Sequence, residues 1–181
     1  MKKYCTLPNF FTALRMAGTV WLLFLRPLSG AFFAVYTLSG VSDVVDGWLA
    51  RRTHSTSELG ARLDSAADLM YYGVMVVKLL PELWASLPKW LWWCAAFVLT
   101  LRAAAYAVAA GKYRRFASLL TYLNKLTGFF VFFLPYFMGH FLTPYCALLA
   151  VVGAASSGEE LAIHLREPVY DPSRKSLFMR K

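Results

Sequence analysis

Long apolar runs recur along this chain, and each is long enough to cross a lipid bilayer. The hydrocarbon core of a bilayer is about 30 Å thick, and a helix crosses it with roughly 20 apolar residues. Runs of this kind occupy residues 10–26, 29–50, 61–81, 88–110, 116–136 and 142–163. With 59% hydrophobic and only 16% charged residues, the composition excludes an ordinary soluble globular protein. The sequence therefore predicts an all-α integral membrane protein with six transmembrane helices.

The positions of the basic residues predict how these helices are oriented. The formal net charge is +9, but the basic side chains form no patch or stripe of the kind that binds nucleic acid. They gather at every second end of the apolar runs: Lys2, Lys3, Arg51, Arg52, Lys112, Arg114, Arg115, Arg166, Arg174, Lys175, Arg180 and Lys181. The opposite ends carry only Arg26 and Lys89. Because cytoplasmic loops are rich in Lys and Arg, both termini are expected in the cytoplasm.

The two ends of the chain differ from the runs between them. Asn9, Thr12 and Arg15 stand at three-residue spacing, which predicts a short N-terminal interfacial helix with one polar stripe. Two interpretations stay open: the stripe faces lipid headgroups, or it faces a site inside the protein. The same residues interrupt the apolar core that a signal peptide needs, so we expect the start to be mature protein. A membrane domain is expected over residues 1–165 and a cytoplasmic tail over residues 166–181.

Four aspartates stand within the second and third runs, where charged side chains are costly. On a helix that advances about 100° per residue, one sector of roughly 140° holds Asp43, Asp46, Gly47, Ala50 and Arg51. A narrower stripe on the next helix holds Gly60, Asp64 and Asp68. If the basic stretch between them is a cytoplasmic turn, the helices are antiparallel. At about 1.5 Å per residue, Asp46 and Asp64 lie about 6–8 Å from that turn, and Asp43 and Asp68 about 12 Å. The carboxylates are therefore expected to face each other in two layers.

Four ionised carboxylates this close would repel one another, so a positive partner is expected among them. Two divalent cations would neutralise four acids, and oxygen ligands favour Mg²⁺ or Mn²⁺ over zinc. Two metals held by shared carboxylates stabilise both oxygens of a displacement at phosphorus. Gly47 and Gly60 would let a ligand approach the helix backbones, and Arg51 would bind a phosphate. From the residues alone, the alternative is the proton or cation pathway of a transporter.

The spacing of these residues matches a known signature, D-x-x-D-G-x-x-A-R, eight residues, then G-x-x-x-D-x-x-x-D. All eight specified positions are filled, so the chain resembles the CDP-alcohol phosphatidyltransferase family. The start "LPNFFTALR" is similar to the P-N-x-x-T-x-x-R start of bacterial members, and "NKLT" at 124–127 is similar to their lysine-bearing fifth span. The six expected crossings extend the resemblance over nearly the whole chain.

The resemblance implies transfer of a phosphatidyl group from CDP-diacylglycerol to a small alcohol, with release of CMP, in phospholipid biosynthesis. It implies that two Mg²⁺ or Mn²⁺ ions are held by Asp43, Asp46, Asp64 and Asp68, and that Asp68 is the catalytic base. It also implies a CDP-diacylglycerol pocket lined by Asn9, Thr12, Gly47, Ala50, Arg51 and Gly60. On the same ground we expect a homodimer in the bacterial cytoplasmic membrane, with its active site facing the cytoplasm.

Two further cations bear on the acceptor alcohol. Arg102 and Lys125 are expected about 13–15 Å inside the fourth and fifth runs, at the level of Asp43 and Asp68. Cations at that depth favour an acceptor with its own phosphate. The resemblance to bacterial members of the family implies glycerol 3-phosphate as that acceptor, bound by Arg102 and Lys125. Alternatively, the Lys125 side chain extends to the membrane interface, or its positive charge balances the negative charge of the aspartates. The stretch "DSAADLM" is closer to serine-using relatives than to the D-P-x-A-D-K of glycerol 3-phosphate users, so serine and inositol phosphate stay open.

A membrane metal or proton transporter stays as the alternative from another class. Transport would need a continuous polar route across the bilayer. Outward of the acids, the second and third runs offer only isolated polar residues such as Thr37, Ser39 and Tyr72, which favours the enzyme.

Overall fold

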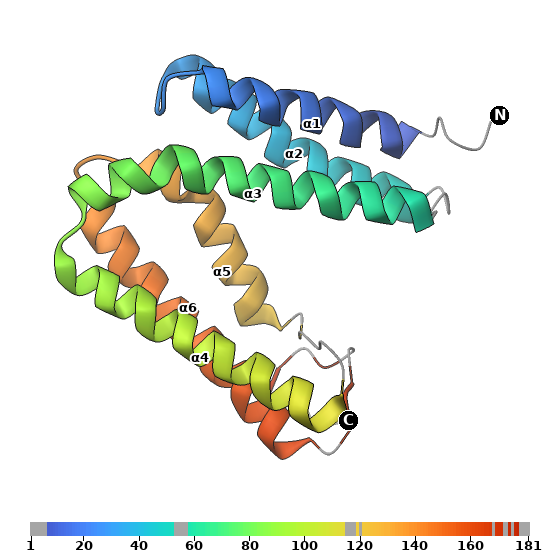
Figure 1. The fold of residues 1–181 in the computed structure, drawn as a ribbon, viewed down its shortest axis with the longest axis vertical. Coiled ribbons are helices and arrows are strands. Elements are labelled where there is room, and N and C mark those ends of the chain that lie inside the picture. Colours follow the sequence, from blue (N-terminus) through green and yellow to red (C-terminus); the bar gives the residue numbers. More distant parts are fainter. Residues whose placement is uncertain are drawn as a thin grey trace. The chain divides into compact units, whose positions relative to one another are not determined.

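The computed structural model describes residues 7–52, 58–114, 119, 121–167, 169–171, 174 and 176–177. In these residues every regular element is helical, and no strand occurs. The elements are α1 (Leu7–Phe24), α2 (Gly30–Arg52), α3 (Glu58–Ser86), α4 (Lys89–Tyr113), α5 (Tyr122–Phe133), the 3₁₀ helix η1 (Leu134–Phe137) and α6 (Leu142–Arg166) (Figure 1). The predicted all-α fold is confirmed, and each predicted run overlaps one α-helix.

Two of the described helices, α4 and α6, are long and apolar enough by themselves to cross a membrane. The helices α2 and α3 have 23 and 29 residues, but the aspartates they carry make them less apolar. The helix α5 has only 12 residues. It begins where Thr121 accepts a hydrogen bond from the backbone N–H of Asn124, and it gives way to η1 at Pro135, which lacks a backbone donor. The six-span topology and the cytoplasmic position of both termini stay predictions.

The expected short interfacial helix is not a separate element among the described residues. The helix α1 runs unbroken from Leu7 to Phe24. Asn9, Thr12 and Arg15 therefore lie on the same helix as the first apolar run. These polar residues interrupt the apolar pattern without ending the helix, because none of them is a strong helix breaker such as Pro or Gly.

The chain forms two compact units, one with α1–α3 and one with α4–α6. In the first unit, α1 and α2 lie side by side (Figure 1). They approach closely at Gly18, where an added Cβ would lie 2.9 Å from the Ser39 Oγ. The helix α3 packs on α2 through Tyr36 and Tyr71, whose stacked rings are 5.7 Å apart. The Tyr71 hydroxyl donates to the Tyr36 carbonyl at 3.2 Å. These contacts hold α1 and α3 against α2.

In the second unit, α6 packs against both α4 and α5. Tyr145 joins α6 to α5, because its hydroxyl donates to the Phe130 carbonyl at 2.7 Å. Near the ends of α4 and α6, the Lys112 Nζ donates to the His164 carbonyl at 2.9 Å. The C-terminal ends of α4 and α6 therefore lie next to each other.

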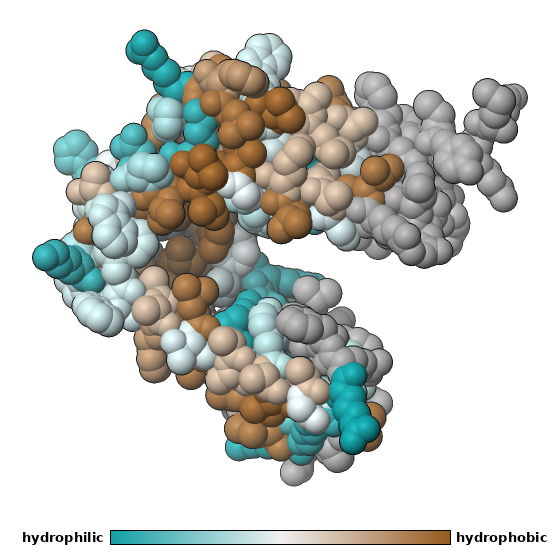
Figure 2. Space-filling view, viewed as in Figure 1, coloured by the Kyte–Doolittle hydropathy of each residue, from teal (hydrophilic) through white to brown (hydrophobic). Residues whose placement is uncertain are grey.

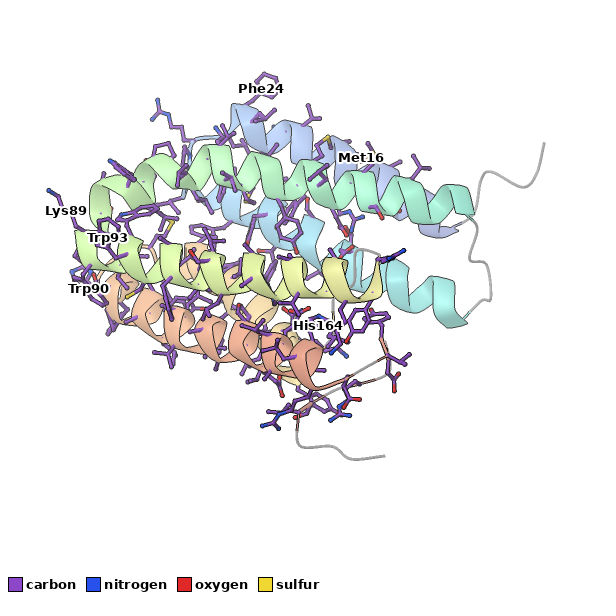
Figure 3. The ribbon with its side chains drawn as sticks, turned by 60° about the horizontal axis from the view of Figure 1, so that its bottom comes forward. Met16, Phe24, Lys89, Trp90, Trp93 and His164 are labelled. Carbon is purple, nitrogen blue, oxygen red and sulfur yellow. The ribbon has the colours of Figure 1, made fainter. Side chains whose placement is uncertain are left out.

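Large apolar side chains cover the outside of the described helices. Phe24 is 81% exposed, Trp93 78% and Leu69 76%, and Figure 2 shows hydrophobic side chains over much of the visible face. Lys89, Trp90 and Trp93 gather at the start of α4 (Figure 3), as is typical of residues at a membrane interface. Soluble proteins rarely expose apolar surface on this scale. The surface and the two long apolar helices indicate a membrane-embedded protein.

Candidate active site

Two aspartates from neighbouring helices meet on one buried arginine. The Nη1 of Arg15 in α1 bonds to the Oδ1 of Asp43 in α2 and lies 3.2 Å from the Oδ1 of Asp68 in α3. The arginine side chain is 1% exposed, whereas the Asp43 and Asp68 side chains are 44% and 43% exposed. A guanidinium buried this deeply requires anionic partners. Asp43 and Asp68 therefore face each other, as their positions along the two helices predict.

The packing of α2 on α3 brings these acids together. Asp43 follows Tyr36 by two helical turns, and Asp68 precedes Tyr71 by one turn, so each acid shares a helix face with a tyrosine of the stacked pair. The tyrosine contacts thus orient the faces that carry the acids. The acidic site is built on helices, not on loops, which favours precise positions for its side chains.

The polar stripe of α1 faces the interior of the first unit. Thr12, Arg15 and Thr19 are 5%, 2% and 0% exposed. They stand three and four residues apart, which places them on one face. The Thr19 hydroxyl donates to the Arg15 carbonyl at 2.8 Å. At Thr12 and Arg15 this decides against the interpretation in which the stripe faces lipid headgroups. From the sequence, Arg15 was placed on the stripe but was given no partner. Its spacing from Thr12 was the available signal that it shares a buried helix face.

The other candidate residues of this unit keep their helical positions, but their side chains lie outside the described residues. They are Asn9 in α1, Asp46, Gly47, Ala50 and Arg51 in α2, and Gly60 and Asp64 in α3. Asp46 lies three residues after Asp43, and Asp64 four residues before Asp68, so helical geometry places each pair on one face of its helix. The second layer of acids and the nucleotide pocket stay predictions.

The described part of the site provides two of the oxygen donors expected for a hard divalent cation. Two carboxylates from different helices converge on one positively charged nitrogen, and oxygen donors are the ligands that Mg²⁺ and Mn²⁺ prefer. Among the side chains that the structure describes, no three potential metal ligands gather. The complete set therefore depends on Asp46 and Asp64, and the two ions stay a prediction.

Arg102, a candidate for binding the acceptor, already has an acidic partner in the second unit. Its Nη1 donates to the Glu160 Oε2 at 2.6 Å, and its Nη2 donates to the Asn124 Oδ1. Sequence reasoning missed Glu160, although an acid inside an apolar run was a signal for it. Lys125, the second candidate, is exposed on α5. Binding of the acceptor by Arg102 and Lys125 stays a prediction.

The model of one protein family, CDP-alcohol phosphatidyltransferase, matches residues 5–156. The chain belongs to this family. The match includes all four aspartates and extends from α1 into α6, so the identification made from the signature is confirmed.

Three curated relatives of this CDP-alcohol phosphatidyltransferase are named for different reactions. A cardiolipin synthase (CMP-forming) from Streptomyces coelicolor is 41% identical over 120 residues, which are 61% of this chain and 52% of that protein. A CDP-diacylglycerol–glycerol-3-phosphate 3-phosphatidyltransferase from Pseudomonas fluorescens is 36% identical over 90 residues, 45% of this chain and 46% of that protein. A CDP-diacylglycerol–serine O-phosphatidyltransferase from Methanocaldococcus jannaschii is 31% identical over 80 residues, 44% of this chain and 37% of that protein. The chain thus spans about half or less of these relatives. No solved structure matches it.

The geometry suits the chemistry of a CDP-alcohol phosphatidyltransferase. A carboxylate exposed like that of Asp68 can accept a proton from a hydroxyl group. The contacts of Arg15 with Asp43 and Asp68 hold both acids near one nitrogen. The first unit therefore places two carboxylates beside each other, and their roles as base and metal ligands stay predictions.

Proposed function

We propose that this chain transfers a phosphatidyl group from CDP-diacylglycerol to the primary hydroxyl of phosphatidylglycerol, releasing CMP and forming cardiolipin. Membership of the family supports the reaction class. The observation that carries the proposal is the meeting of Asp43 and Asp68 on Arg15, at positions of the family signature. A transporter is disfavoured because the family match includes the same acids.

The residues divide into three roles in this reaction. The acceptor oxygen bonds to the phosphorus that carries diacylglycerol, the bond from that phosphorus to the CMP oxygen breaks, and Asp68 takes the hydroxyl proton. Two Mg²⁺ or Mn²⁺ ions would be held by Asp43, Asp46, Asp64 and Asp68. When bound, such ions stabilise the charge on the attacking and leaving oxygens. The donor would be held by Asn9, Thr12, Gly47, Ala50, Arg51 and Gly60.

Two observations support phosphatidylglycerol as the acceptor. The relative that is 41% identical is named as a cardiolipin synthase that forms CMP, and release of CMP from CDP-diacylglycerol leaves phosphatidylglycerol as the second substrate. In addition, Arg102 is paired with the buried Glu160. This pairing leaves less uncompensated positive charge for an acceptor phosphate. A phosphodiester carries less negative charge than a phosphate monoester, so it requires less positive charge from the protein.

Glycerol 3-phosphate, the acceptor expected from the sequence, is the second candidate. A relative that is 36% identical is named for that reaction, and the exposed Lys125 provides a positive group. Serine has weaker support, since its ammonium group is a poor match for Arg102 and Lys125. Inositol phosphate is supported by the same cations but by none of the three relatives' names.

The same proposal places the enzyme in the bacterial cytoplasmic membrane as a homodimer, with its site facing the cytoplasm. The exposed apolar surface and the two long apolar helices support the membrane location. Basic residues at alternate ends of the predicted runs support the orientation. The homodimer rests on family resemblance alone.

A CMP-release assay with purified protein tests this function. CDP-diacylglycerol is supplied with phosphatidylglycerol, glycerol 3-phosphate, serine or inositol phosphate in separate reactions containing Mg²⁺. We expect CMP release with phosphatidylglycerol, and we expect loss of that activity in excess EDTA and in Asp68→Asn. Release with serine alone would refute the acceptor and leave the reaction class standing. No release with any of the four acceptors would contradict the proposed function itself.

A further inference from the structure

A buried acid on α6 joins three parts of the second unit. Glu160 is 1% exposed. Its Oε2 accepts from the Nη1 of Arg102 on α4 at 2.6 Å, and its Oε1 accepts from the backbone N–H of Leu119 at 2.8 Å. Asn124 on α5 completes the arrangement. Its Oδ1 accepts from the Arg102 Nη2, and its Nδ2 donates to the Leu119 carbonyl at 2.9 Å. Arg102, Glu160, Asn124 and the Leu119 backbone form a closed ring of hydrogen bonds, which we call the Glu160 ring.

The two charged members of the Glu160 ring differ in accessibility. The Arg102 side chain is 24% exposed, whereas the Glu160 side chain is 1% exposed. A buried carboxylate without a cation would carry a large desolvation penalty, so the pairing satisfies both charges. Both oxygens of Glu160 are engaged inside the ring. Of the two charged members, Arg102 is therefore the one that a ligand can reach, and Glu160 acts on a ligand only through Arg102.

We propose that Glu160 is a positioning residue that selects the acceptor by fixing Arg102 and balancing its charge. This inference rests on the proposed function and on the expected binding of the acceptor by Arg102. A guanidinium whose charge is already balanced still donates hydrogen bonds, but it adds little attraction for a second negative charge. The phosphodiester of phosphatidylglycerol carries one negative charge. The monoester of glycerol 3-phosphate carries nearly two at neutral pH. The Glu160 ring thus favours the phosphodiester.

The substitution Glu160→Gln tests this selection directly. Glutamine keeps an oxygen that accepts a hydrogen bond, but it removes the negative charge beside Arg102. CMP release is measured with phosphatidylglycerol and with glycerol 3-phosphate for the wild type and the variant. We expect the ratio of kcat/KM for glycerol 3-phosphate to that for phosphatidylglycerol to rise about tenfold. The change should lie in KM for the acceptor, with KM for CDP-diacylglycerol unchanged.

The neighbouring Glu159 provides a matched control. Its Oε1 accepts from the Ser176 hydroxyl at 2.9 Å and from the Leu177 backbone N–H at 3.0 Å, so its partners lie in the C-terminal segment. Glu159→Gln makes the same chemical change one residue away on the same helix. We expect it to leave the acceptor ratio unchanged. A loss of negative charge anywhere on α6 is thereby separated from the loss of the Arg102 partner.

Two more variants keep the test decisive if Glu160→Gln fails to fold. Arg102→Gln removes the positive charge and leaves Glu160, so the ratio should fall below that of the wild type. The double variant Arg102→Gln with Glu160→Gln removes both charges and should bring the ratio back to within about twofold of the wild type. A ratio that rises in one single variant, falls in the other and returns in the double variant indicates charge balance. Damage to the fold would instead lower both activities in every variant.

The outcomes separate this proposal from the proposed function. Wild-type protein that releases CMP with neither glycerol acceptor overturns both. Wild-type activity with an unchanged ratio in Glu160→Gln overturns only the positioning role and makes the Glu160 ring a structural link. If that variant does not fold, equal ratios in Arg102→Gln and the double variant overturn the role in the same way.

Discussion

Arg15 is one side chain that connects three helices. Its buried guanidinium extends from α1 to Asp43 in α2 and Asp68 in α3. Without a cation between them, the two carboxylates would face each other with like charges, which is unfavourable. Arg15 therefore supplies a positive partner for these acids. A divalent ion that binds the same oxygens must compete with it.

Replacing Arg15 by Met tests this competition. Met fills much of the space of the arginine stem but removes the charge. In EDTA, the variant should lose about 2 kcal/mol of unfolding free energy, which lowers the apparent Tm by about 4–8 °C. Mn²⁺ should raise the Tm of the variant more than that of the wild type, because the competing cation is gone. Thermal melts in detergent, with EDTA or with Mn²⁺, measure both effects.

The substitution Arg26→Met, at an exposed arginine of the same unit, is the control. It should change neither the Tm in EDTA nor the rise in Tm with Mn²⁺. An equal or smaller metal-induced rise in Arg15→Met would contradict competition.

At the scale of elements, the position of Arg15 depends on how closely α1 approaches α2. Gly18 lies one turn after Arg15, and a Cβ there would lie 2.9 Å from the Ser39 Oγ and 3.6 Å from the Val35 Cγ1. Ser39 is 4% exposed, so its side chain has little room to move. A side chain at Gly18 would therefore displace the Ser39 hydroxyl or move α1 away from α2.

Two glycine-to-alanine substitutions should change stability in opposite directions. Gly73 lies in α3 with nothing within 4 Å of an added Cβ. Gly73→Ala should raise the unfolding free energy by up to about 1 kcal/mol, because alanine is the better helix former. Gly18→Ala gains the same propensity but overpacks the contact with Ser39, and it should lower the unfolding free energy by about 1–3 kcal/mol. Thermal melts of both variants in one detergent provide the comparison. Stabilisation by Gly18→Ala would show that α1 and α2 are not in tight contact there.

The helices and the facing acids could be predicted from the sequence for simple reasons. Apolar runs of bilayer length form helices, and the helical period places Asp64 and Asp68 on one face. The two ends of α5 could not be predicted in this way, because its start depends on the Thr121 cap and its end on Pro135. The partnership between Arg102 and Glu160 was also missed. Periodicity identifies the face on which a residue lies, but it does not identify the side chain on the neighbouring helix.

For the chain as a whole, the second unit constrains how helices can be placed in a membrane. The Lys112 Nζ near the end of α4 donates to the carbonyls of His164 and Leu165 near the end of α6. The Tyr113 hydroxyl donates to the Glu167 carbonyl at 2.9 Å. The helices α4 and α6 therefore run in the same direction, and their C-terminal ends must emerge on the same side of a bilayer. The basic residues near these ends predict that this side is the cytoplasmic one.

Labelling of single cysteines tests this topology across both units. The experiment starts from a variant in which alanine replaces the three native cysteines, Cys5, Cys94 and Cys146. Thr56→Cys lies between the two acidic helices, Arg114→Cys at the end of α4, and Phe141→Cys at the start of α6. A membrane-impermeant maleimide on intact cells should label only Phe141→Cys, and the other two should react only after the membrane is permeabilised. Phe141 is 70% exposed, so its accessibility does not depend on local unfolding. Labelling of all three from one side would contradict six crossings.

Protection of Thr56→Cys in intact cells would support a cytoplasmic turn between α2 and α3. Such a turn puts Asp46 and Asp64 about 6–8 Å from the cytoplasmic interface. The diphosphate of a membrane-bound CDP-lipid lies at this level.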